Sequence, residues 1–487
     1  MSVSSTETNN IEIEVMELQN LVKKYTYNVS PVNDDSTFDD IIDSNPFVST
    51  QYIDGNKSSD IITSKLYYIL SLWTFGQTKK SIHILLLIHC NIFFYAFTYW
   101  VLMPILPTLI TDINPNEKIY GYYSSIRAFA ALFGAPLMGL LIDKTGTKFP
   151  IFIGQLFSGF MYFGLGCSHL ISNVILLYIS GLFACMQHLF LGSQGTISHL
   201  TLKRDRDQAM GRLSACYAIG MIPGSLLSGI LQNMFGITTT ICFMAFISTS
   251  VAVINVLFLP NLKSEMDKNN KTIDADGDGE TMEMEGNANI THHCKDMFKV
   301  LKNKRVRRFI IFVFLYTFGL GMWASIFNLF MKDYGFNTEQ IGVFIAIAAA
   351  IMAICNSLFI GPILGLITEN TLFIVSVFVC GLSVLIISII TEYFKLQYYE
   401  LILISIPKVI STGFLYVIVN GKLSKLVELK DVGKSIALSH SMNAFIAIIT
   451  PIIGVQLASS NIGYALNGYI AFILCIVSII VFKIIVK

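Results

Sequence analysis

The stretch "VFLYTFGLGMWASIFNLFM", from Val313 to Met331, decides the fold class of this chain. It contains no charged residue, and about 20 residues of apolar helix cross the hydrocarbon core of a bilayer. The whole chain is 54% hydrophobic and only 13% charged, against about 25% charged residues in ordinary soluble proteins. These values predict an integral membrane protein built from transmembrane helices.

Apolar runs of similar length recur along the chain and predict an all-α membrane protein with twelve spans in two sets of six. The expected spans are 81–109, 119–141, 149–168, 173–197, 211–233, 237–260, 309–331, 341–366, 372–391, 399–420, 435–459 and 463–485.

The polar segments outside these spans predict four regions. Residues 1–79 are expected to form a disordered N-terminal tail, with a short interfacial segment from Leu66 to Gly76. Residues 80–260 and 309–487 form the two six-helix halves. Residues 261–308 form a linker, acidic in its first part and basic in its second. The tail is polar and acidic, unlike a secretory signal.

Basic residues predict the orientation, because cytoplasmic loops of membrane proteins are enriched in lysine and arginine. One side carries Lys79, Lys80, Lys144, Lys148, Lys203, Arg204, Arg206, the basic cluster 302–308, Lys422, Lys425, Lys430 and Lys434. The other side carries little beyond Lys118, Lys332 and Lys395. Both termini and the linker are therefore expected in the cytoplasm. Whether the membrane is the plasma membrane or an internal one stays open.

The two halves repeat each other weakly. "PLMGLLID" (136–143) aligns with "PILGLITE" (362–369), and "MGR" (210–212) aligns with "VGK" (432–434). Each pair falls at the same place within its half. Such internal repetition is typical of transporters whose substrate site lies between two related halves.

The segment "GLLIDKTGTK", from 139 to 148, is the most specific motif. It resembles the signature of the major facilitator superfamily, G-x-L-x-D-x-x-G-[RK]-[RK], between spans two and three. Gly139, Leu141, Asp143, Gly146 and Lys148 match it, whereas Thr147 replaces a basic residue. Gly139 permits close helix contact, and Gly146 supplies a tight turn.

A second motif lies in span five, "AIGMIPGSLLSG", with Gly220, Pro223, Gly224 and Gly229. It is similar to the glycine-proline motif of the antiporter branches of this superfamily, and small residues at these positions allow helices to pack closely. The surrounding sequence resembles the organic-cation-transporter-like and tetracycline-antiporter branch. The resemblance implies a twelve-helix transporter that works by alternating access between its halves.

The superfamily resemblance also implies a cytoplasmic gate. The motif aspartate is expected to contact the start of span eleven, so Asp143 would pair with Lys434. By the internal repeat, Glu369 would pair with Arg212. Surface pairs of this kind contribute only ~0–1 kcal/mol, which is enough to bias two states of nearly equal energy.

Charged and polar residues inside the spans are candidates for binding or coupling, because they are costly in lipid. Lys408 lies near the middle of span ten, and Arg127 in the outer third of span two. For both, a structural role is the alternative. Neutral candidates for binding or coupling are His89, Asn91, Gln187, His188, Asn328, His440 and Asn443. Each single histidine is more often a packing residue, and His188 beside Gln187 is the best candidate among them.

No aspartate or glutamate lies deep in any span, so the interior is cationic. A cationic cavity favours a carboxylate- or phosphate-bearing solute, whereas the branch resemblance favours an organic cation or drug exchanged for protons. We expect an organic anion, with the cation:proton antiporter as the runner-up and a transport-inactive receptor or partner protein of the same fold as a third alternative. Proton coupling would then fall to a histidine.

The segment "DADGDGETMEME" matches the calcium-loop pattern through Asp274, Asp276, Asp278 and Glu285. No apolar helical face flanks it, so an acidic linker is the favoured interpretation, with a calcium-regulated carrier as an alternative. No nucleophile–base pair or metal-ligand set has a credible spacing. We therefore expect no enzyme activity and no cofactor. The expected partners are a small organic solute, protons as a coupling ion and the lipid bilayer, with no nucleic acid, and the protein is expected to be a monomer.

Overall fold

The computed structural model describes residues 70, 74, 79–146, 148–201, 206–260, 300–355, 359–394, 397–426, 432–459 and 463–486. The chain divides into two compact units, Met1–Leu72 and Trp73–Lys487, and every helix considered below belongs to the second. The expected linker, up to residue 299, and its calcium-loop match lie outside the described residues.

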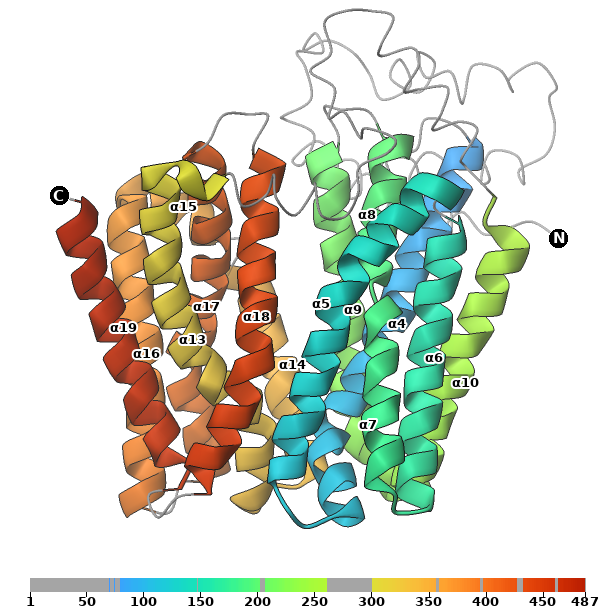
Figure 1. Cartoon of the computed structure of the whole chain (residues 1–487), viewed down its shortest axis with the longest axis horizontal. Coiled ribbons are helices and arrows are strands. Elements are labelled where there is room, and N and C mark those ends of the chain that lie inside the picture. The colour runs from blue at the N-terminus through green and yellow to red at the C-terminus, as the bar shows by residue number, and fades with distance from the viewer. Residues whose placement is uncertain are drawn as a thin grey trace, which may run out of the picture. The chain divides into compact units, whose positions relative to one another are not determined.

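Helices α4 to α10 make up the first six crossings (Figure 1). Their bounds are α4 Lys79–Ile113, α5 Lys118–Thr145, α6 Lys148–Leu170, α7 Val174–Leu182, α8 Leu189–Leu200, α9 Arg206–Phe235 and α10 Ile237–Phe258. The 3-10 helix η1, Phe183–Met186, joins α7 to α8. The fourth crossing, expected as one span over 173–197, is therefore interrupted.

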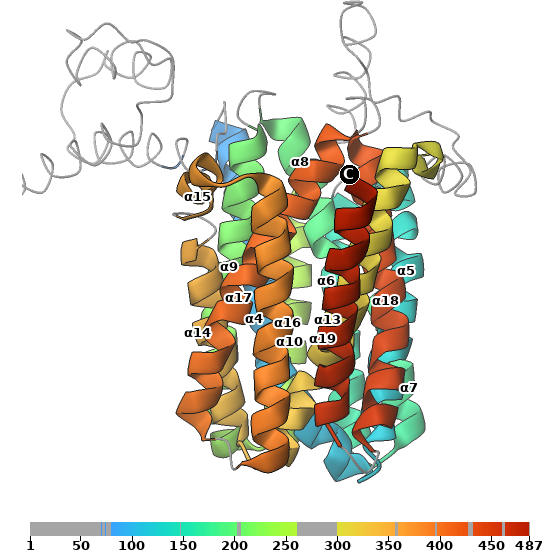
Figure 2. The ribbon, with the colours of Figure 1, turned by 90° about the vertical axis from the view of Figure 1, so that its left-hand side faces the viewer.

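The C-terminal half repeats this arrangement and is seen from its outer side in Figure 2. Its bounds are η3 Val300–Lys302, α13 Lys304–Asp333, α14 Thr338–Ile354, α15 Ile360–Leu366, α16 Glu369–Tyr393, α17 Tyr398–Lys425, α18 Val432–Ala458 and α19 Ala465–Val486. Helices α14 and α15 share the eighth crossing.

The all-α prediction is confirmed, since the described residues form helices and no strand. Ten helical segments of the described residues, the interrupted fourth crossing Val174–Gln194 among them, are long and apolar enough to cross a membrane on length and composition alone. The remaining two crossings are α5, which contains Arg127, Asp143 and Lys144, and the seventeen-residue α14. Together they complete the twelve spans of the major facilitator fold.

Short loops connect the crossings because local side chains cap the helix ends. Asn337 and Gln340 form a capping box at the start of α14, and Asn173 accepts a hydrogen bond from the Leu176 amide at the start of α7. Gly236 and Gly335 adopt positive φ angles of 78° and 97° where the chain reverses. The capping side chains form hydrogen bonds with backbone amides at the helix ends, which lipid could not do.

Within the N-terminal half, α9 packs tightly on α4 through small residues. A Cβ atom on Gly224 would lie 2.6 Å from the Phe97 carbonyl oxygen, and one on Gly220 would overlap the Phe93 carbonyl. Helices in lipid associate largely through such close van der Waals packing. Gly211, on the same helix, has no atom within 4 Å of the equivalent position.

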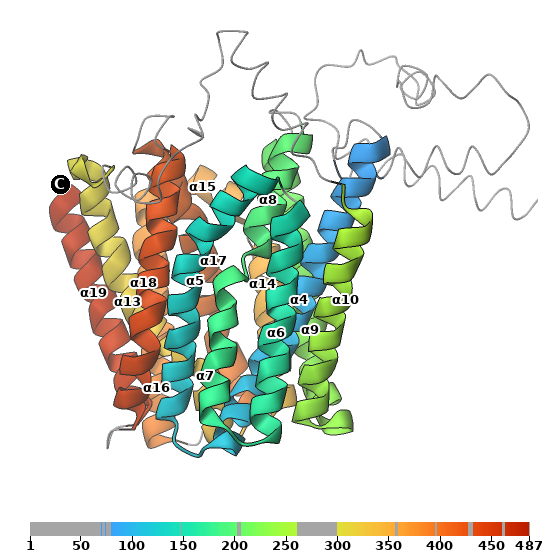
Figure 3. The ribbon, with the colours of Figure 1, turned by 45° about the vertical axis from the view of Figure 1, so that its right-hand side comes forward.

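The two halves meet closely toward one end of the bundle. A Cβ atom on Gly121 of α5 would lie 2.8 Å from the Pro451 carbonyl of α18, and Gly342 of α14 packs directly on the Ser225 carbonyl of α9. We call this the contact end and the opposite one, which holds Gly146, the motif end. Helices α5 and α18 lie side by side at the contact end and diverge toward the motif end (Figures 1 and 3).

Replacing Gly224 by alanine should destabilise the protein, because the added methyl group meets backbone atoms of α4. We expect the free energy of unfolding to fall by about 1–3 kcal/mol. The matched control is Gly211→Ala on the same helix, which should be neutral or stabilising by up to about 1 kcal/mol. Denaturation of both variants in mild detergent measures the difference, and equal stability of the two would refute this packing.

Candidate functional site

Arg127 is the charged group of the N-terminal half that lies deepest in the described helices. It projects from α5 and is partly buried. Its Nη2 donates a hydrogen bond of 2.8 Å to the Tyr99 hydroxyl, and its guanidinium carbon lies 5.3 Å from the centre of the Tyr99 ring. Its Nη1 is buried and has no hydrogen-bond partner among the described residues. Arg127 therefore keeps donor capacity that a ligand can use.

Aromatic side chains from α4 and α9 surround Tyr99. The Trp100 indole Nε1 donates a hydrogen bond of 3.1 Å to the Tyr217 hydroxyl. Tyr95 lies 6.4 Å from Tyr217 and 6.5 Å from Tyr99, between ring centres. Such rings offer flat apolar faces with polar edges, which suit a planar organic solute.

Lys408 is the corresponding cation of the C-terminal half. It projects from α17, directly after Pro407, and its Nζ lies 5.0 Å from the centre of the Phe327 ring on α13. No carboxylate among the described residues forms an ion pair with it. A cation–π contact compensates only part of the hydration that a buried ammonium group loses.

The aromatic groups beside the two cations adjoin each other. Phe327 packs in a cluster with Trp323, Phe330 and Phe344. Trp100, from the N-terminal half, packs against the same cluster. Both halves therefore contribute one cation and several aromatic rings to one region of the interface, and this region is the candidate site.

The interruption of the fourth crossing brings Gln187 and His188 to α5. The His188 Nε2 lies 2.8 Å from the Ala131 carbonyl oxygen, and since a carbonyl only accepts, this nitrogen carries the proton. Gln187 exposes its own carbonyl oxygen, which accepts a hydrogen bond of 3.1 Å from Tyr95. Its side-chain Nε2 is buried and has no hydrogen-bond partner among the described residues.

Gly134 explains how the interruption packs so closely on α5. A Cβ atom at this position would overlap the Cys185 carbonyl group of η1. The α5 helix therefore packs directly on the interrupted segment, and His188 adds a hydrogen bond between the two. The His188 bond to Ala131 is a contact between the fourth crossing and α5, and a role of His188 or Gln187 in binding or coupling stays a prediction.

Asn91 and His89 of α4 have partners within the N-terminal half. Asn91 and Asn255 of α10 are fully buried and exchange two hydrogen bonds, one of them 2.8 Å long. The His89 Nδ1 donates to the Leu85 carbonyl at 2.6 Å. The Asn91 bonds join α4 to α10, and the His89 bond lies within α4; a role of either residue in binding or coupling stays a prediction.

The remaining neutral candidates are spread along the interface. The Asn328 side chain of α13 donates to the Met103 carbonyl of α4 at 3.4 Å, which links the two halves. Asn443 is exposed on α18. His440 lies on the same helix, and its side chain is outside the described residues. These residues are not brought together into one cluster.

The gating motif is described mainly by its backbone. Gly146 adopts a φ of 76°, which is the tight turn expected between α5 and α6, and Lys148 begins α6. Asp143 and Lys434 lie on α5 and α18, which pack together, and their side chains are outside the described residues. Arg212 lies near the start of α9 and Glu369 begins α16. The two predicted ion pairs stay predictions.

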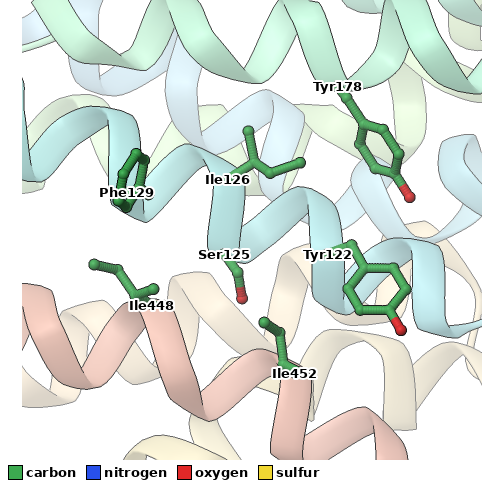
Figure 4. Close-up of a pocket in the computed structure, with 7 residues that line it drawn as sticks. All are labelled: Tyr122, Ser125, Ile126, Phe129, Tyr178, Ile448 and Ile452. Carbon is green, nitrogen blue, oxygen red and sulfur yellow. The ribbon is translucent and has the colours of Figure 1, made fainter.

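A shallow groove of about 390 Å³ lies on the surface between α5, α7 and α18 (Figure 4). Its lining residues are Tyr122, Ser125, Ile126, Phe129, Tyr178, Ile448 and Ile452. It holds no charged side chain, and Phe129 is 51% exposed. The lining of the groove includes neither Arg127 nor Lys408. Among the described residues, no group of His, Cys, Asp and Glu side chains could hold a metal ion.

Sequence reasoning missed the partners that define these sites. Each of these partners lies on a different crossing from the residue that it contacts: Tyr99 from Arg127, Asn255 from Asn91, and Phe327 from Lys408. Asn255 could have been noticed as a second buried amide in the sixth span. The aromatic residues offer no such signal, because phenylalanine and tyrosine are common throughout membrane helices.

The amide pair of Asn91 and Asn255 should behave as one unit. Replacing either residue by leucine leaves the other amide unpaired, so we expect each single variant to lose about 1–2 kcal/mol of stability. The double variant should lose less than the sum. A double-mutant cycle measured by denaturation tests this, with the exposed Asn443→Leu as a control that changes little. Strictly additive losses would contradict the pairing.

Comparisons with known proteins agree with this architecture. The rat protein "Solute carrier family 22 member 18" is 25% identical over 371 residues, which cover 75% of this chain and 85% of that protein. "Multidrug resistance protein 2" of Bacillus subtilis (strain 168) is 26% identical, over 60% of this chain and 69% of its own length. "Tetracycline resistance protein, class G" of Vibrio anguillarum is 30% identical over 28% of this chain and 34% of that protein.

Among solved structures, the nucleoside transporter NupG superposes with a TM-score of 0.61, at 17% sequence identity, over 84% of this chain and 98% of its own. A mutant of the same transporter reaches a TM-score of 0.65. At this identity the likeness concerns the fold alone. The family model described as Major Facilitator Superfamily matches residues 88–406, well over half of the chain. With twelve crossings, the motif between the second and third, and this match, the chain belongs to the major facilitator superfamily.

Proposed function

We propose that this transporter of small solutes carries an organic anion, most simply a carboxylate. The observation that supports the proposal is the pair of partly buried cations, Arg127 and Lys408, one in each half. Neither has a carboxylate partner among the described residues. Two unpaired cations that face an aromatic region form a site whose charge an anionic solute would neutralise.

Energetics favour this solute class over a cation. A cationic solute would add a third positive charge where two already lack neutralising partners. An anion would replace part of the hydration that Arg127 and Lys408 lose on burial. The ring faces of Tyr99 and Phe327 would accommodate an apolar body attached to the charged group.

We further propose an orientation and a cycle. From the distribution of basic residues we infer that the motif end faces the cytoplasm and that both termini and the linker 261–308 are cytoplasmic. The close contacts through Gly121 and Gly342 then lie on the far side of the membrane. This arrangement is the inward-facing state of a rocker-switch cycle, in which one monomer exposes the site alternately to each side. Closing the motif end would form the Asp143–Lys434 and Glu369–Arg212 pairs.

The second candidate is an organic cation or drug antiporter that exchanges its substrate for protons. The relatives named as multidrug and tetracycline resistance proteins favour it. A transport-inactive receptor of the same fold is the third. Solute-dependent uptake into liposomes that contain the purified protein would exclude the receptor.

Replacing Lys408 by methionine should weaken anion binding, because methionine keeps the length of the side chain and removes its charge. We expect a carboxylate from a panel of organic anions to raise the melting temperature of the wild-type protein. In Lys408→Met its affinity should fall about 10- to 100-fold, the effect of one charge-assisted hydrogen bond. Thermal unfolding against matched panels of anions and cations measures both.

The matched control is Lys422→Met. Lys422 lies on the same helix, with its Nζ 5.6 Å from the ring centre of Phe309 and 5.1 Å from that of Phe482, toward the motif end. Like Lys408, Lys422 makes cation–π contacts, but it lies outside the candidate site. Stabilisation by cations alone, insensitive to Lys408→Met, would contradict the anion proposal and support the antiporter.

Exchanging the charges of Asp143 and Lys434 tests the cytoplasmic gate. Asp143→Lys and Lys434→Asp should each slow uptake of the stabilising carboxylate into liposomes, and the double variant should recover it. A pair worth ~0–1 kcal/mol shifts the two states by up to about fivefold. The control double variant combines Asp143→Lys with Lys148→Asp and should not recover. A charge exchange as inactive as its single variants would show that these residues do not pair.

A further inference from the structure

The nitrogen atoms around the two cations share one property, which is that they can only donate hydrogen bonds. Arg127 Nη1 and Gln187 Nε2 are buried and have no hydrogen-bond partner among the described residues. The same holds for the indole Nε1 of Trp323, a fully buried side chain of α13. Lys408 Nζ contacts the Phe327 ring and forms no hydrogen bond with any residue that the structure describes. The candidate site therefore holds a set of unused donors.

Contacts between neighbouring side chains place the donors of the N-terminal half together. The Tyr95 hydroxyl donates to the Gln187 carbonyl oxygen at 3.1 Å, and the Tyr95 ring lies 6.5 Å from the Tyr99 ring. Tyr99 in turn accepts the hydrogen bond of Arg127. The residue that follows Gln187 contacts α5 one turn after Arg127. Arg127 and Gln187 thus flank the same two tyrosine rings.

The donors of the C-terminal half adjoin this group across the interface. Trp323 lies one turn before Phe327 on α13, with their ring centres 6.1 Å apart, and Phe327 makes the cation–π contact with Lys408. Trp100 of α4 packs against the same aromatic cluster. The Ser405 hydroxyl on α17, one turn before Lys408, is buried and unpaired within the described part of the chain. A hydroxyl group can donate as well as accept.

The tyrosine hydroxyl groups of the region already accept hydrogen bonds. The Tyr99 oxygen accepts one of 2.8 Å from Arg127, and the Tyr217 oxygen accepts one of 3.1 Å from the Trp100 Nε1. Neither hydroxyl donates to another residue in the described helices. Their protons add to the donors that a bound molecule could use.

The buried, unpaired atoms that can only accept lie elsewhere. In the residues that the structure describes, they are the side-chain oxygens of Gln155, Gln232 and Asn467. The Gln155 backbone carbonyl accepts from Ser248 of α10, and the Gln232 carbonyl accepts at the turn between α9 and α10. Asn467 donates to the Gly454 carbonyl. These contacts involve no residue of the candidate site.

We propose that the solute is a carboxylate whose other polar groups only accept hydrogen bonds, which in its simplest form is an α-keto acid. The inference rests on the proposed anion site and narrows the class of anion that it takes. The carboxylate would neutralise Arg127 and Lys408, and Gln187 Nε2 would donate to the keto oxygen. Because a buried donor without an acceptor is costly, a solute that brings acceptors gains most from this site. Gln187, the uncharged donor beside Arg127, is then a specificity-determining residue.

The same donors predict which close analogues bind less well. An α-hydroxy acid of the same carbon skeleton brings a further proton donor to a group of donors, and an α-amino acid brings an ammonium group beside two cations. We expect the affinity to fall about 5- to 100-fold from the keto acid to the hydroxy acid, the effect of one unpaired polar group. The amino acid should bind more weakly still.

Two matched series of solutes test this selectivity. Phenylpyruvate, phenyllactate and phenylalanine share one carbon skeleton, and pyruvate, lactate and alanine share another. Each would be titrated against the purified full-length protein at about pH 7, where every carboxyl group is ionised and the amino groups are protonated. Thermal unfolding gives the apparent affinities. The keto acid should bind most tightly within a series.

Gln187→Leu should abolish the preference, because leucine has a similar size and donates no hydrogen bond. The affinities for phenylpyruvate and phenyllactate should then agree within about twofold. The matched control is Gln194→Leu, the same change two turns further along the fourth crossing, at a partly exposed position outside the site. This variant should keep the preference of the wild type. The wild-type series decides the question even where a variant does not fold.

The outcomes separate this inference from the proposed function. Hydroxy or amino acids that bind as tightly as their keto counterparts would overturn the inference and leave the anion proposal intact. Binding of other carboxylates, with neither keto acid bound, would do the same. A preference that persists unchanged in Gln187→Leu would refute the role of Gln187. Stabilisation by organic cations alone would instead overturn the anion proposal itself.

Discussion

Close approach of helix backbones at the contact end is the constraint on which the rest of the structure depends. Gly121 faces the Pro451 carbonyl and Gly342 faces the Ser225 carbonyl, so α5 meets α18 and α9 meets α14 with no side chain between them. Because lipid is itself apolar, the hydrophobic effect does not drive helices together within it. Close van der Waals packing between the helix backbones therefore holds the halves together. Because the halves touch there and diverge toward the motif end, the contact end also defines which side of the bundle is closed.

The interface between the two halves also contains two cationic side chains. Arg127 and Lys408 come from different halves, and each rests on an aromatic ring rather than a carboxylate. Cation–π contacts hold a side chain in position while leaving its hydrogen-bond donors available. Among the described residues, carboxylates lie instead at helix ends, such as Asp333 at the end of α13 and Glu369 at the start of α16.

Much of this architecture could be predicted from the sequence, because apolar run length and loop charge are local properties. The twelve crossings and the turn at Gly146 followed from such signals. The site could be predicted only in part. Lys408 and Arg127 stand out as charges in lipid, but the Asn255 partner of Asn91 and the break at Gln187 depend on packing between distant segments.

The central claim is that this protein transports an organic anion, and uptake into proteoliposomes tests it most directly. Panels of radiolabelled carboxylates and organic cations would be compared in wild-type, Arg127→Met and Lys408→Met liposomes, with protein-free liposomes as background. The account predicts saturable uptake of at least one carboxylate, reduced in both variants. Uptake confined to cations and unchanged in both variants would contradict it.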